Sequence, residues 1–284
     1  MLRTALSVVI PTKNNSKTLS CLLNSINQQT PGVVEVIVVD GQSQDDTLAI
    51  AERLGARVVS YGTEGDQRGL ARNLGARVAH GEFLIFLDSD MQLAEGVIDD
   101  CSQLISAGAE AIIIPEVTLG SGCLGRTRAW ERRLVERSNL TAVARVVRKA
   151  TFDRVGGFNP EIVGFEDLDF QAKLIEAGVA MTRSSVPLFH HEEDIDVITY
   201  LRKRMYYSRS AHLYRSFHPQ LSKGVFSFNS RTRTYLSGIK SSRDFAPFIC
   251  AVWFRALEVI AWYIIRLSIA VERRRVRLAD NWHS

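Results

Sequence analysis

Short apolar runs that alternate with helical patterns dominate the first 115 residues of the chain. Runs rich in β-branched and aromatic residues predict strands at 6–11, 33–40, 56–60, 82–87 and 110–115. Uninterrupted apolar strands separated by helices predict an α/β fold, in which helices cover both faces of a mostly parallel sheet. The intervening segments have apolar residues at helical spacing and lie at 19–29, 47–54, 69–79 and 96–107.

The composition is that of an ordinary globular protein. The chain has 284 residues, of which 46% are apolar and 23% are charged. These proportions exclude a collagen-like, coiled-coil or mainly disordered chain. None of the four cysteines lies in a CxxC or other metal-ligand spacing. We therefore expect free thiols in a reducing compartment rather than a disulfide framework or a zinc ribbon.

Charge divides the chain into two parts. Residues 196–284 hold 16 basic and 5 acidic side chains, a net charge of +11, which leaves −7 for residues 1–195. We expect a catalytic domain over 1–195 and a basic, aromatic-rich helical extension over 196–284. The asymmetry indicates that the extension meets something anionic, although a solvated helix face would show the same composition.

The chain shows no signal for export or membrane spanning. Arg3 is the single charge before a strand-like run that ends at Pro11, which does not match a secretion signal. No stretch of 18 or more residues is free of charge, so a transmembrane helix is not expected. We expect a cytoplasmic protein, peripheral on the inner face of the membrane if the extension binds lipid.

Polar residues follow the predicted strands at the edge where open α/β sheets bind ligands. Pro11 and Thr12 lie at the end of the first strand, and Asp40 ends the second. Asp88 and Asp90 follow the strongly apolar fourth strand. Paired carboxylates there could hold a hard divalent cation together with substrate phosphates, although short acidic turns also serve as caps.

Two further groups are candidates for chemistry. Glu166 and Asp167 precede or open a predicted helix. A carboxylate at that position could be a general base, or could simply stabilise the helix N-terminus. His190 and His191 follow a probable strand, and an imidazole there could complete a metal shell or have a structural role.

Several nucleotide-binding and hydrolase motifs are missing. The sequence has no GxGxxG after the first strand, no GxxxxGK[ST] and no GxSxG. A Rossmann dinucleotide site, a Walker site and an α/β-hydrolase elbow therefore have no support.

Five blocks of sequence together point to one family. In order, the chain contains LSVVIPTKNN, VVEVIVVDGQSQDDT, GLARNLGARVAHGEFLIFLDSDM, RKATFDRVGGFNPEIVGFEDLDFQAKLIEAG and HH. The chain resembles the family 2 glycosyltransferases over about residues 5–195. The resemblance implies a GT-A fold, which is a Rossmann-like sheet flanked by helices, here with a C-terminal helical extension. It also implies inverting transfer of a sugar from a nucleotide sugar to an acceptor hydroxyl.

The resemblance also implies roles for individual residues. Asp90 matches a metal ligand, and His190 matches a second one better than His191, although the doublet leaves this open. Asp167 matches the general base, with Glu166 as the backup. The residues expected at the nucleotide, ribose and diphosphate are Pro11, Thr12, Asp40, Arg68, Arg72, Asp88 and Ser89.

These residue types suit the chemistry of the transfer. Mg²⁺ or Mn²⁺ that bridges both phosphates would neutralise the leaving group, and arginine can add a bidentate contact. Asp167 would take a proton from the acceptor hydroxyl as that oxygen attacks the anomeric carbon from the opposite face. One general base typically contributes about 10²–10⁴-fold to the rate, so we expect metal and positioning to matter at least as much.

Donor and acceptor are less constrained than the class of reaction. Family frequency favours a UDP-sugar, with GDP-mannose second, and the acceptor could be a glycan, a lipid-linked sugar or a small molecule. A retaining GT-A transferase and a catalytically silent nucleotide-sugar-binding protein remain alternatives. A nucleotidyltransferase would need a Gly-rich basic loop after the first strand, which PTKNNSKT lacks. Nucleic acid is not an expected partner.

The extension has three distinct segments. Residues 194–214 predict a basic helix on which Arg204 could contact the donor diphosphate, and residues 216–244 read as a polar loop. Residues 246–271 are apolar but contain Arg255, Glu258 and Arg266, and an arginine cluster follows. This last segment fits either an anionic membrane surface or a helix packed on the body or at a dimer interface. Membrane association would favour a lipid-linked acceptor.

Overall fold

The computed structural model describes the backbone of residues 5–29, 33–62, 67–192, 196–208 and 210–280. Within these ranges, the side chains of 34, 228–231, 261–262 and 264–280 are not described.

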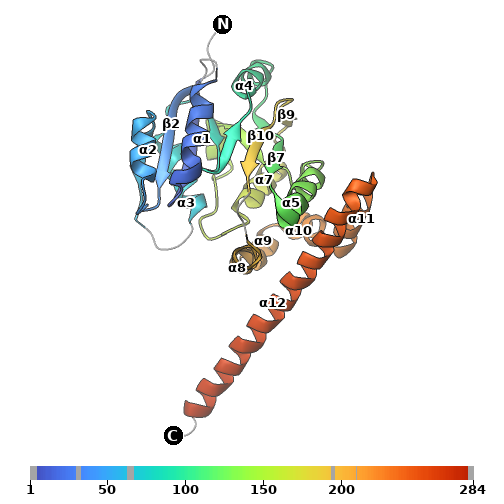
Figure 1. Cartoon of the computed structure of the whole chain (residues 1–284). Coiled ribbons are helices and arrows are strands. Elements are labelled where there is room, and N and C mark those ends of the chain that lie inside the picture. The colour runs from blue at the N-terminus through green and yellow to red at the C-terminus, as the bar shows by residue number, and fades with distance from the viewer. Residues whose placement is uncertain (1–4, 30–32, 63–66, 193–195, 209, 281–284) are drawn as a thin grey trace.

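A seven-stranded sheet forms the centre of the protein, in the order β3-β2-β1-β4-β8-β6-β9 (Figure 1). β8 is antiparallel to both of its neighbours, and the other pairs of neighbouring strands are parallel. The prediction of a mostly parallel α/β sheet is therefore confirmed. The strands are β1 (Leu6–Thr12), β2 (Val33–Asp40), β3 (Arg57–Ser60), β4 (Phe83–Phe86), β6 (Ala111–Ile113), β8 (Ala144–Arg148) and β9 (Met181–Arg183).

A second sheet of three short strands lies beside the first, in the order β5-β10-β7. Its strands are β5 (Met91–Leu93), β10 (Leu188–His191) and β7 (Glu116–Leu119). In this sheet His190 pairs with Met91, immediately after the Asp88–Asp90 segment. The sequence analysis did not predict β5, β7 or β8, because strands of three to five residues carry little periodic signal. His190 and His191 lie within β10 rather than after the probable strand.

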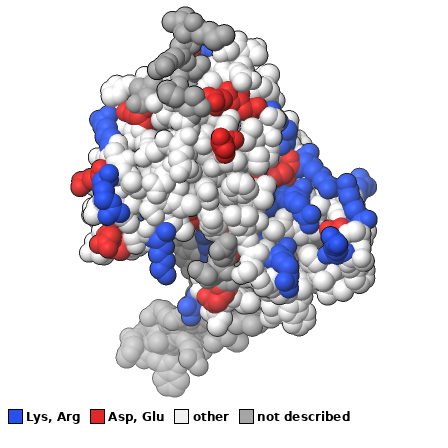
Figure 2. All heavy atoms as spheres, turned by 45° about the horizontal axis from the view of Figure 1, so that its top comes forward, with Lys and Arg blue, Asp and Glu red and all other residues white. Residues whose placement is uncertain are grey.

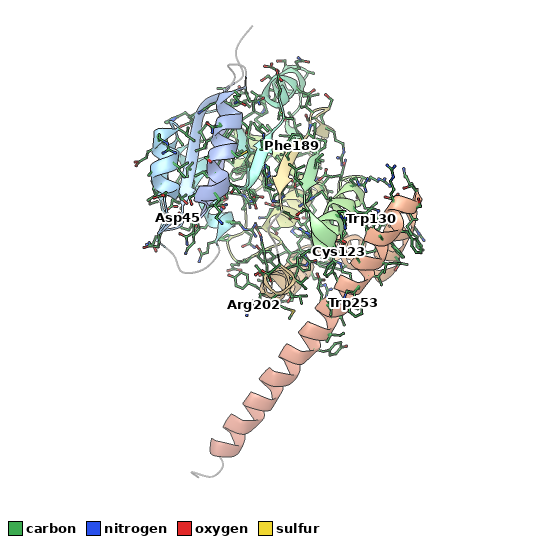
Figure 3. The ribbon with its side chains drawn as sticks, viewed as in Figure 1. Asp45, Cys123, Trp130, Phe189, Arg202 and Trp253 are labelled. Carbon is green, nitrogen blue, oxygen red and sulfur yellow. The ribbon has the colours of Figure 1, made fainter. Side chains whose placement is uncertain are left out.

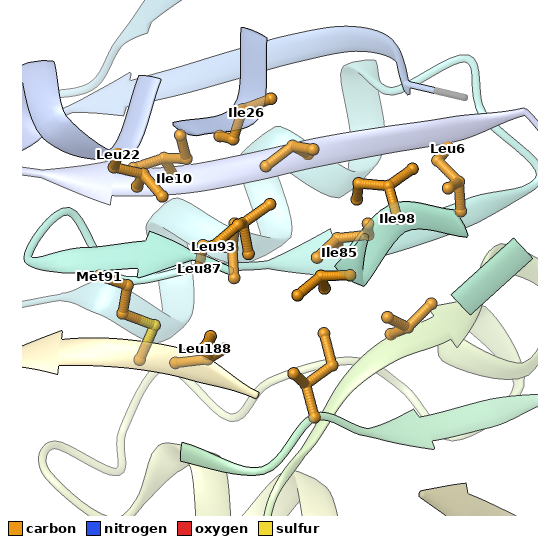
Figure 4. Close-up of a cluster of buried hydrophobic side chains, with 14 of the residues drawn as sticks. Leu6, Ile10, Leu22, Ile26, Ile85, Leu87, Met91, Leu93, Ile98 and Leu188 are labelled. Atoms are coloured by element: carbon orange, nitrogen blue, oxygen red, sulfur yellow. The ribbon is translucent and has the colours of Figure 1, made fainter. Parts of the chain in front are cut away.

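Helices cover the large sheet on two faces, and each face has its own apolar core. Alternate residues of β1 point to opposite faces, with Val8 and Ile10 in one core and Val9 in the other. Figure 4 shows the first core, in which side chains of β1 meet those of α1, α4 and the β4–β5 region. The helices of the body are α1 (Ser16–Asn27), α2 (Thr47–Arg53), α3 (Arg68–Val78), α4 (Val97–Ser106), α5 (Gly122–Val135), α6 (Lys149–Arg154) and α7 (Glu166–Glu176).

Gly75 allows α3 to lie unusually close to the sheet. A Cβ atom at this position would collide with Val9 and touch Val39 at 3.0 Å. The close approach positions Arg72, which lies about one turn earlier on the same helix. A small residue in α3 thus helps to place a charged one against the ends of the strands.

Two predictions for the extension are wrong. Residues 194–214 do not form one helix, because α8 (Val197–Ser208) is followed by a separate α9 (Ala211–Phe217). Residues 216–244 are not mainly loop, because they contain α10 (Pro219–Phe226) and α11 (Phe228–Gly238).

Tertiary packing explains the extra helices. Pro219 occupies the first turn of α10, where a missing N–H is tolerated. The Phe226 ring lies 5.6 Å from that of Phe165, and the Tyr235 ring lies 5.4 Å from that of Trp130. Contacts with distant residues therefore stabilise helices that their polar sequence did not predict.

The chain ends in a helix of 39 residues, α12 (Ser242–Asp280). Its first half packs on α5 and α8, and its second half extends beyond the rest of the protein (Figure 1). Among the described residues, no helix has the length and apolarity needed to cross a bilayer. The four cysteines are free thiols, and the sulfur atoms of Cys123 on α5 and Cys250 on α12 lie 2.7 Å apart.

Candidate active site

The Asp88–Asp90 segment connects the central sheet to the small sheet. It follows β4 and leads directly into β5. The Asp88 side chain is 16% exposed and that of Asp90 is 33% exposed. Ser89 is buried and accepts a hydrogen bond from the Asn15 side chain. The two carboxylates therefore have different surroundings, because one faces the protein interior and the other is more accessible.

Arg72 lies at the centre of the predicted site and is fully buried. Its guanidinium nitrogens lie 2.5 Å from Asp88, 2.8 Å from Asp167 and 3.4 Å from Glu166. Arg68, one turn earlier on α3, lies 3.1 Å from Glu166. Helix α3 thus joins the start of α7 to the acidic segment after β4. The structure brings together two distant blocks of the sequence, because Arg72 and Asp88 lie in the third quoted block and Glu166 and Asp167 in the fourth.

Arg145 and Glu116 also belong to this cluster, and the sequence analysis missed both. Arg145 of β8 lies 2.6 Å from Glu116 of β7 and 3.6 Å from both Asp88 and Asp167. Arg145 and Glu116 are buried. A signal was present, because ARVVR places a charged residue between positions of an otherwise apolar strand. Such a charge needs a buried partner, but no sequence pattern says which one.

The two histidines point to different partners. The Nε2 atom of His190 lies 3.2 Å from the Asp90 carboxylate, and Nδ1 lies 3.7 Å from Glu116. The neighbouring His191 instead contacts the Gln92 side chain at 3.1 Å. Successive residues of a strand face opposite sides, so only one of the pair can face Asp90. The structure places His190 there.

Arginines favour the ionised form of Asp88. Burial alone would raise the pKa of this carboxyl, but Arg72 and Arg145 lower it below its ordinary value. Burial raises the pKa of Glu166; Arg68 opposes this rise and the adjacent Asp167 adds to it. Each of these carboxylates contacts two arginines, but Asp88 lies closer to Arg72 and has no adjacent acidic residue, so Asp88 is the better stabilised anion.

Whereas arginines surround Asp88, carboxylates surround His190. Burial disfavours a positive charge on its ring, but the interactions with Asp90 and Glu116 raise the pKa to about 10. Burial would likewise raise the pKa of Glu116, yet Arg132 and Arg145 hold it well below its usual range. Carboxylates therefore make the surroundings of His190 favourable for positive charge.

The donor set at Asp90 and His190 fits a divalent cation that arrives with its substrate. The pair offers a carboxylate oxygen, which suits Mg²⁺ and Mn²⁺, and an imidazole nitrogen, which suits transition-metal ions. In the part of the chain that the structure describes, no group of three or more His, Cys, Asp or Glu side chains is arranged to hold a metal. A shell of two residues leaves positions for diphosphate oxygens and water, as such cations commonly require.

The predicted nucleotide edge lies at the ends of β1 and β2. Thr12 and Asp40 are neighbours across this pair of strands. Asp40 accepts hydrogen bonds from the backbone N–H and the hydroxyl of Ser43, at 2.9 and 2.5 Å. Pro11 and Thr12 are buried, and the Thr12 hydroxyl has no hydrogen-bond partner among the described residues.

Arg204 lies with the extension rather than with the acidic cluster. Its guanidinium contacts Glu258 of α12 at 3.0 Å. The ion pair joins α8 to α12, so in this structure Arg204 helps to attach the last helix. Its predicted contact with the donor stays a prediction.

Comparison with known families agrees with this arrangement. The sequence model described as Glycosyl transferase family 2 matches residues 7–160, which is more than half of the chain. The chain belongs to glycosyl transferase family 2. It is accordingly a glycosyltransferase that uses a nucleotide-sugar donor.

Proteins of similar sequence are also named as glycosyltransferases. "PGL/p-HBAD biosynthesis glycosyltransferase" of Mycobacterium tuberculosis is 29% identical over 186 residues, which cover 62% of this chain and 72% of the relative. Poly(ribitol-phosphate) beta-N-acetylglucosaminyltransferase TarS of Staphylococcus aureus is 36% identical over 105 residues, which cover 35% of this chain and 18% of TarS.

Two solved glycosyltransferase structures are similar in fold to almost the whole chain. TarS 1-349 of S. aureus, in complex with UDP-GlcNAc, has a TM-score of 0.54 at 18% identity and covers 94% of this chain and 92% of that one. Mannosyltransferase PcManGT of Pyrobaculum calidifontis, in complex with GDP-Man and Mn²⁺, has a TM-score of 0.59 at 17% identity, with coverages of 93% and 86%. At these identities the similarity concerns the fold, which is GT-A-like.

Proposed function

We propose that this glycosyltransferase inverts the anomeric carbon in a single displacement, with Asp167 as the general base. The observation that carries the proposal is the position of Asp167, which two buried arginines hold beside Asp88. Arg72 lies 2.8 Å from its carboxylate and Arg145 lies 3.6 Å away. A base must lie within about 3 Å of the proton it removes, so fixed placement matters more than basicity alone.

Exposure distinguishes Asp167 from Glu166. The Asp167 side chain is 24% exposed, whereas that of Glu166 is 3% exposed and lies against Arg68 and Arg72. An acceptor hydroxyl can therefore reach Asp167 more readily. We infer that Glu166 holds Arg68 and Arg72 in position through its ion pairs with them.

Arg72 and Arg68 have separate roles in this proposal. Arg72 is fully buried between carboxylates, so it positions Asp88 and Asp167 rather than reaching the donor diphosphate. The Arg68 side chain is 29% exposed and lies on the same helix. Arg68 is therefore the better candidate for a bidentate contact with a phosphate.

Asp90 and His190 would hold the divalent metal. Bound there with the donor, Mn²⁺ or Mg²⁺ supplies Lewis-acid neutralisation of the leaving diphosphate. Thr12 and Asp40 would line the nucleoside, at the strand edge where ligands of open α/β sheets bind. Asp88, ionised by its arginines, would accept a hydrogen bond from the ribose.

A UDP-sugar is the first choice of donor, and GDP-mannose is the second. Support comes from the fold neighbours, of which one was solved with UDP-GlcNAc and another with GDP-Man and Mn²⁺. The name of TarS, a poly(ribitol-phosphate) transferase, supports a polymer acceptor. A glycan or a small-molecule acceptor carries the same reacting hydroxyl.

Donor binding and donor hydrolysis test the proposal. We would measure both across a panel of nucleotide sugars with Mn²⁺, with Mg²⁺ and with EDTA. We expect metal-dependent binding of one donor, which Asp90→Ala abolishes and which the control Asp99→Ala on α4 retains. Failure to bind any donor, with or without metal, would refute the assignment. With an acceptor, the anomeric configuration of the product decides between inversion and retention.

A further inference from the structure

Beyond its first turn, the charged side chains of α12 that the structure describes are Arg255 and Glu258, and both face the protein. Arg255 lies 2.7 Å from Glu131 of α5 and 2.7 Å from Glu258. Glu258 in turn accepts a hydrogen bond from the Tyr200 hydroxyl at 2.8 Å and contacts Arg204 of α8 at 3.0 Å. Arg255 and Glu258, two of the charges that interrupt this apolar segment in the sequence, therefore attach α12 to the body and do not lie on its outer side.

The outer side of α12 is apolar over its described length. Its large exposed apolar residues fall on one face of the helix when about 3.6 residues make each turn. Between the first and the last the helix rises about 27 Å, at about 1.5 Å per residue. We call this face the α12 stripe. Its members are Phe245, Ile249, Val252, Trp253, Val259, Ile260 and Tyr263.

The α12 stripe is too exposed to belong to the core. The Trp253 side chain is 63% exposed, although the next residue, Phe254, is 7% exposed against the body. Figure 3 shows Trp253 on the part of α12 that leaves the body, whereas Trp130 lies between α5 and the start of α12. A contiguous apolar face of this kind on a protein surface marks a site of contact.

The charge around the stripe points to its partner. Residues 196–284 carry a net charge of +11, and the α12 sequence continues into Arg273, Arg274, Arg275 and Arg277. Figure 2 shows Lys and Arg gathered on the side of the molecule where α5, α11 and the start of α12 lie in Figure 1. Two such extensions would repel one another, whereas an anionic surface would attract either.

We propose that the α12 stripe docks on an anionic lipid bilayer, with the helix lying in the interface. Exposed Trp253 and Tyr263 suit the headgroup region, and a basic flank adds attraction to anionic lipids. The proposal goes beyond the transfer reaction and concerns where the enzyme works. Docking would hold the catalytic body beside membrane-embedded acceptors. This last consequence rests on the proposed function.

Co-sedimentation with vesicles tests docking without donor or acceptor, so it is independent of the proposed chemistry. The full chain and the variant Trp253→Gln/Ile260→Gln would be compared on phosphatidylcholine vesicles with and without phosphatidylglycerol. We expect wild-type binding only with the anionic lipid, and a loss of about tenfold or more in the variant. The control Val117→Gln, an exposed apolar residue on β7, should bind like the wild type.

Two further measurements keep the proposal falsifiable. Arg273→Gln/Arg274→Gln/Arg275→Gln should weaken vesicle binding and reduce its dependence on salt. Thermal melting should show that all variants remain folded. Equal binding to both kinds of vesicle, or unchanged binding by the stripe variant, would overturn the proposal. A lipid-free dimer that the stripe variant dissociates, with no vesicle binding, would assign the stripe to a second copy instead.

Discussion

The catalytic body and the last helix break the usual distribution of polar and apolar residues in opposite ways. The body buries Arg72, Arg145 and Glu116 beneath its active-site edge. Helix α12 exposes residues such as Trp253 and Ile260. Charged side chains are almost never fully buried unless they are paired, and large exposed apolar patches are uncommon on monomers.

The buried charges of the body and the exposed apolar residues of α12 each reduce stability or leave it unimproved, so we expect each to serve a function. Buried ion pairs contribute little to net stability, because desolvation offsets their attraction. Their value here is geometric, since Arg72 and Arg145 hold Asp88 and Asp167 in fixed positions. The α12 stripe leaves apolar area in water, which a partner surface would remove. Interior charge thus marks the proposed chemistry, and exterior apolar surface marks the proposed docking.

The largest expected effect is on turnover. Asp167→Asn keeps the shape of the side chain but removes the base, so we expect kcat to fall about 10²–10⁴-fold while donor binding is retained. Initial rates and donor titrations measure both quantities. Asp153→Asn, an exposed aspartate on α6, is the matched control. Turnover near the wild-type value in Asp167→Asn would show that the buried arginines position some other base.

The next effect concerns the stability of the buried network. Arg145→Met leaves Glu116 without its 2.6 Å partner, which should cost about 3–5 kcal/mol in the free energy of unfolding. Urea denaturation measures this. Arg148→Met, at the end of the same strand, removes an exposed pair with Glu82 and should cost about 1 kcal/mol or less. Similar costs for the two variants would contradict the comparison between interior and surface charge.

A smaller effect should appear in acid, at the border between the two regions. Burial would raise the pKa of Glu192, but hydrogen bonds from Arg128 of α5 lower it to about 2. Because the folded-state pKa is depressed, the stabilisation is complete above the unfolded-state pKa near 4.5 and is lost as pH falls toward 2.

Glu192→Gln tests this pH dependence. We expect the variant to be less stable than the wild type by on the order of 2–3 kcal/mol at neutral pH. The difference should shrink as pH falls from about 4.5 to about 2, as followed by denaturation at several pH values. A difference that stays constant across this window would mean that the ion pair does not stabilise the junction.

The smallest effect should come from the α12 stripe. Trp253→Gln should change the free energy of unfolding by about 0.5 kcal/mol or less, because the side chain is exposed. Its neighbour Phe254 packs on Tyr200, so Phe254→Ala should cost about 3–5 kcal/mol. Denaturation of the two variants measures the contrast. A large loss in Trp253→Gln would show that the stripe supports the fold of the monomer.

Local patterns predicted most of the central sheet. The apolar runs before Thr12, Asp40 and Asp88 are strands in the structure; Thr12 and Asp40 are the last residues of β1 and β2, and Asp88 lies just after β4. They also placed Asp88, Asp90, Asp167 and the histidine pair as candidates. The strand predictions are confirmed because alternation and apolar runs are properties of neighbouring residues, whereas the roles of the site residues stay predictions.

Local sequence patterns did not predict the short strands or the polar helices of the extension. β8 carries Arg145, but a five-residue run with a charge in it has no clear period. α10 and α11 have few apolar residues, and distant aromatic rings such as Trp130 and Phe165 stabilise them. Tertiary contacts override weak local preference in such segments.

The sequence by itself determined the family, the positions of the main strands along the chain and the acidic residues at or near their ends. Only the tertiary structure decided that His190 rather than His191 faces Asp90. It also decided that Arg72 is enclosed by carboxylates, and that Arg255 and Glu258 point inward. The physical reason is separation along the sequence. A strand or helix pattern lies within a few neighbouring residues, whereas a buried charge pairs with a residue tens of positions away.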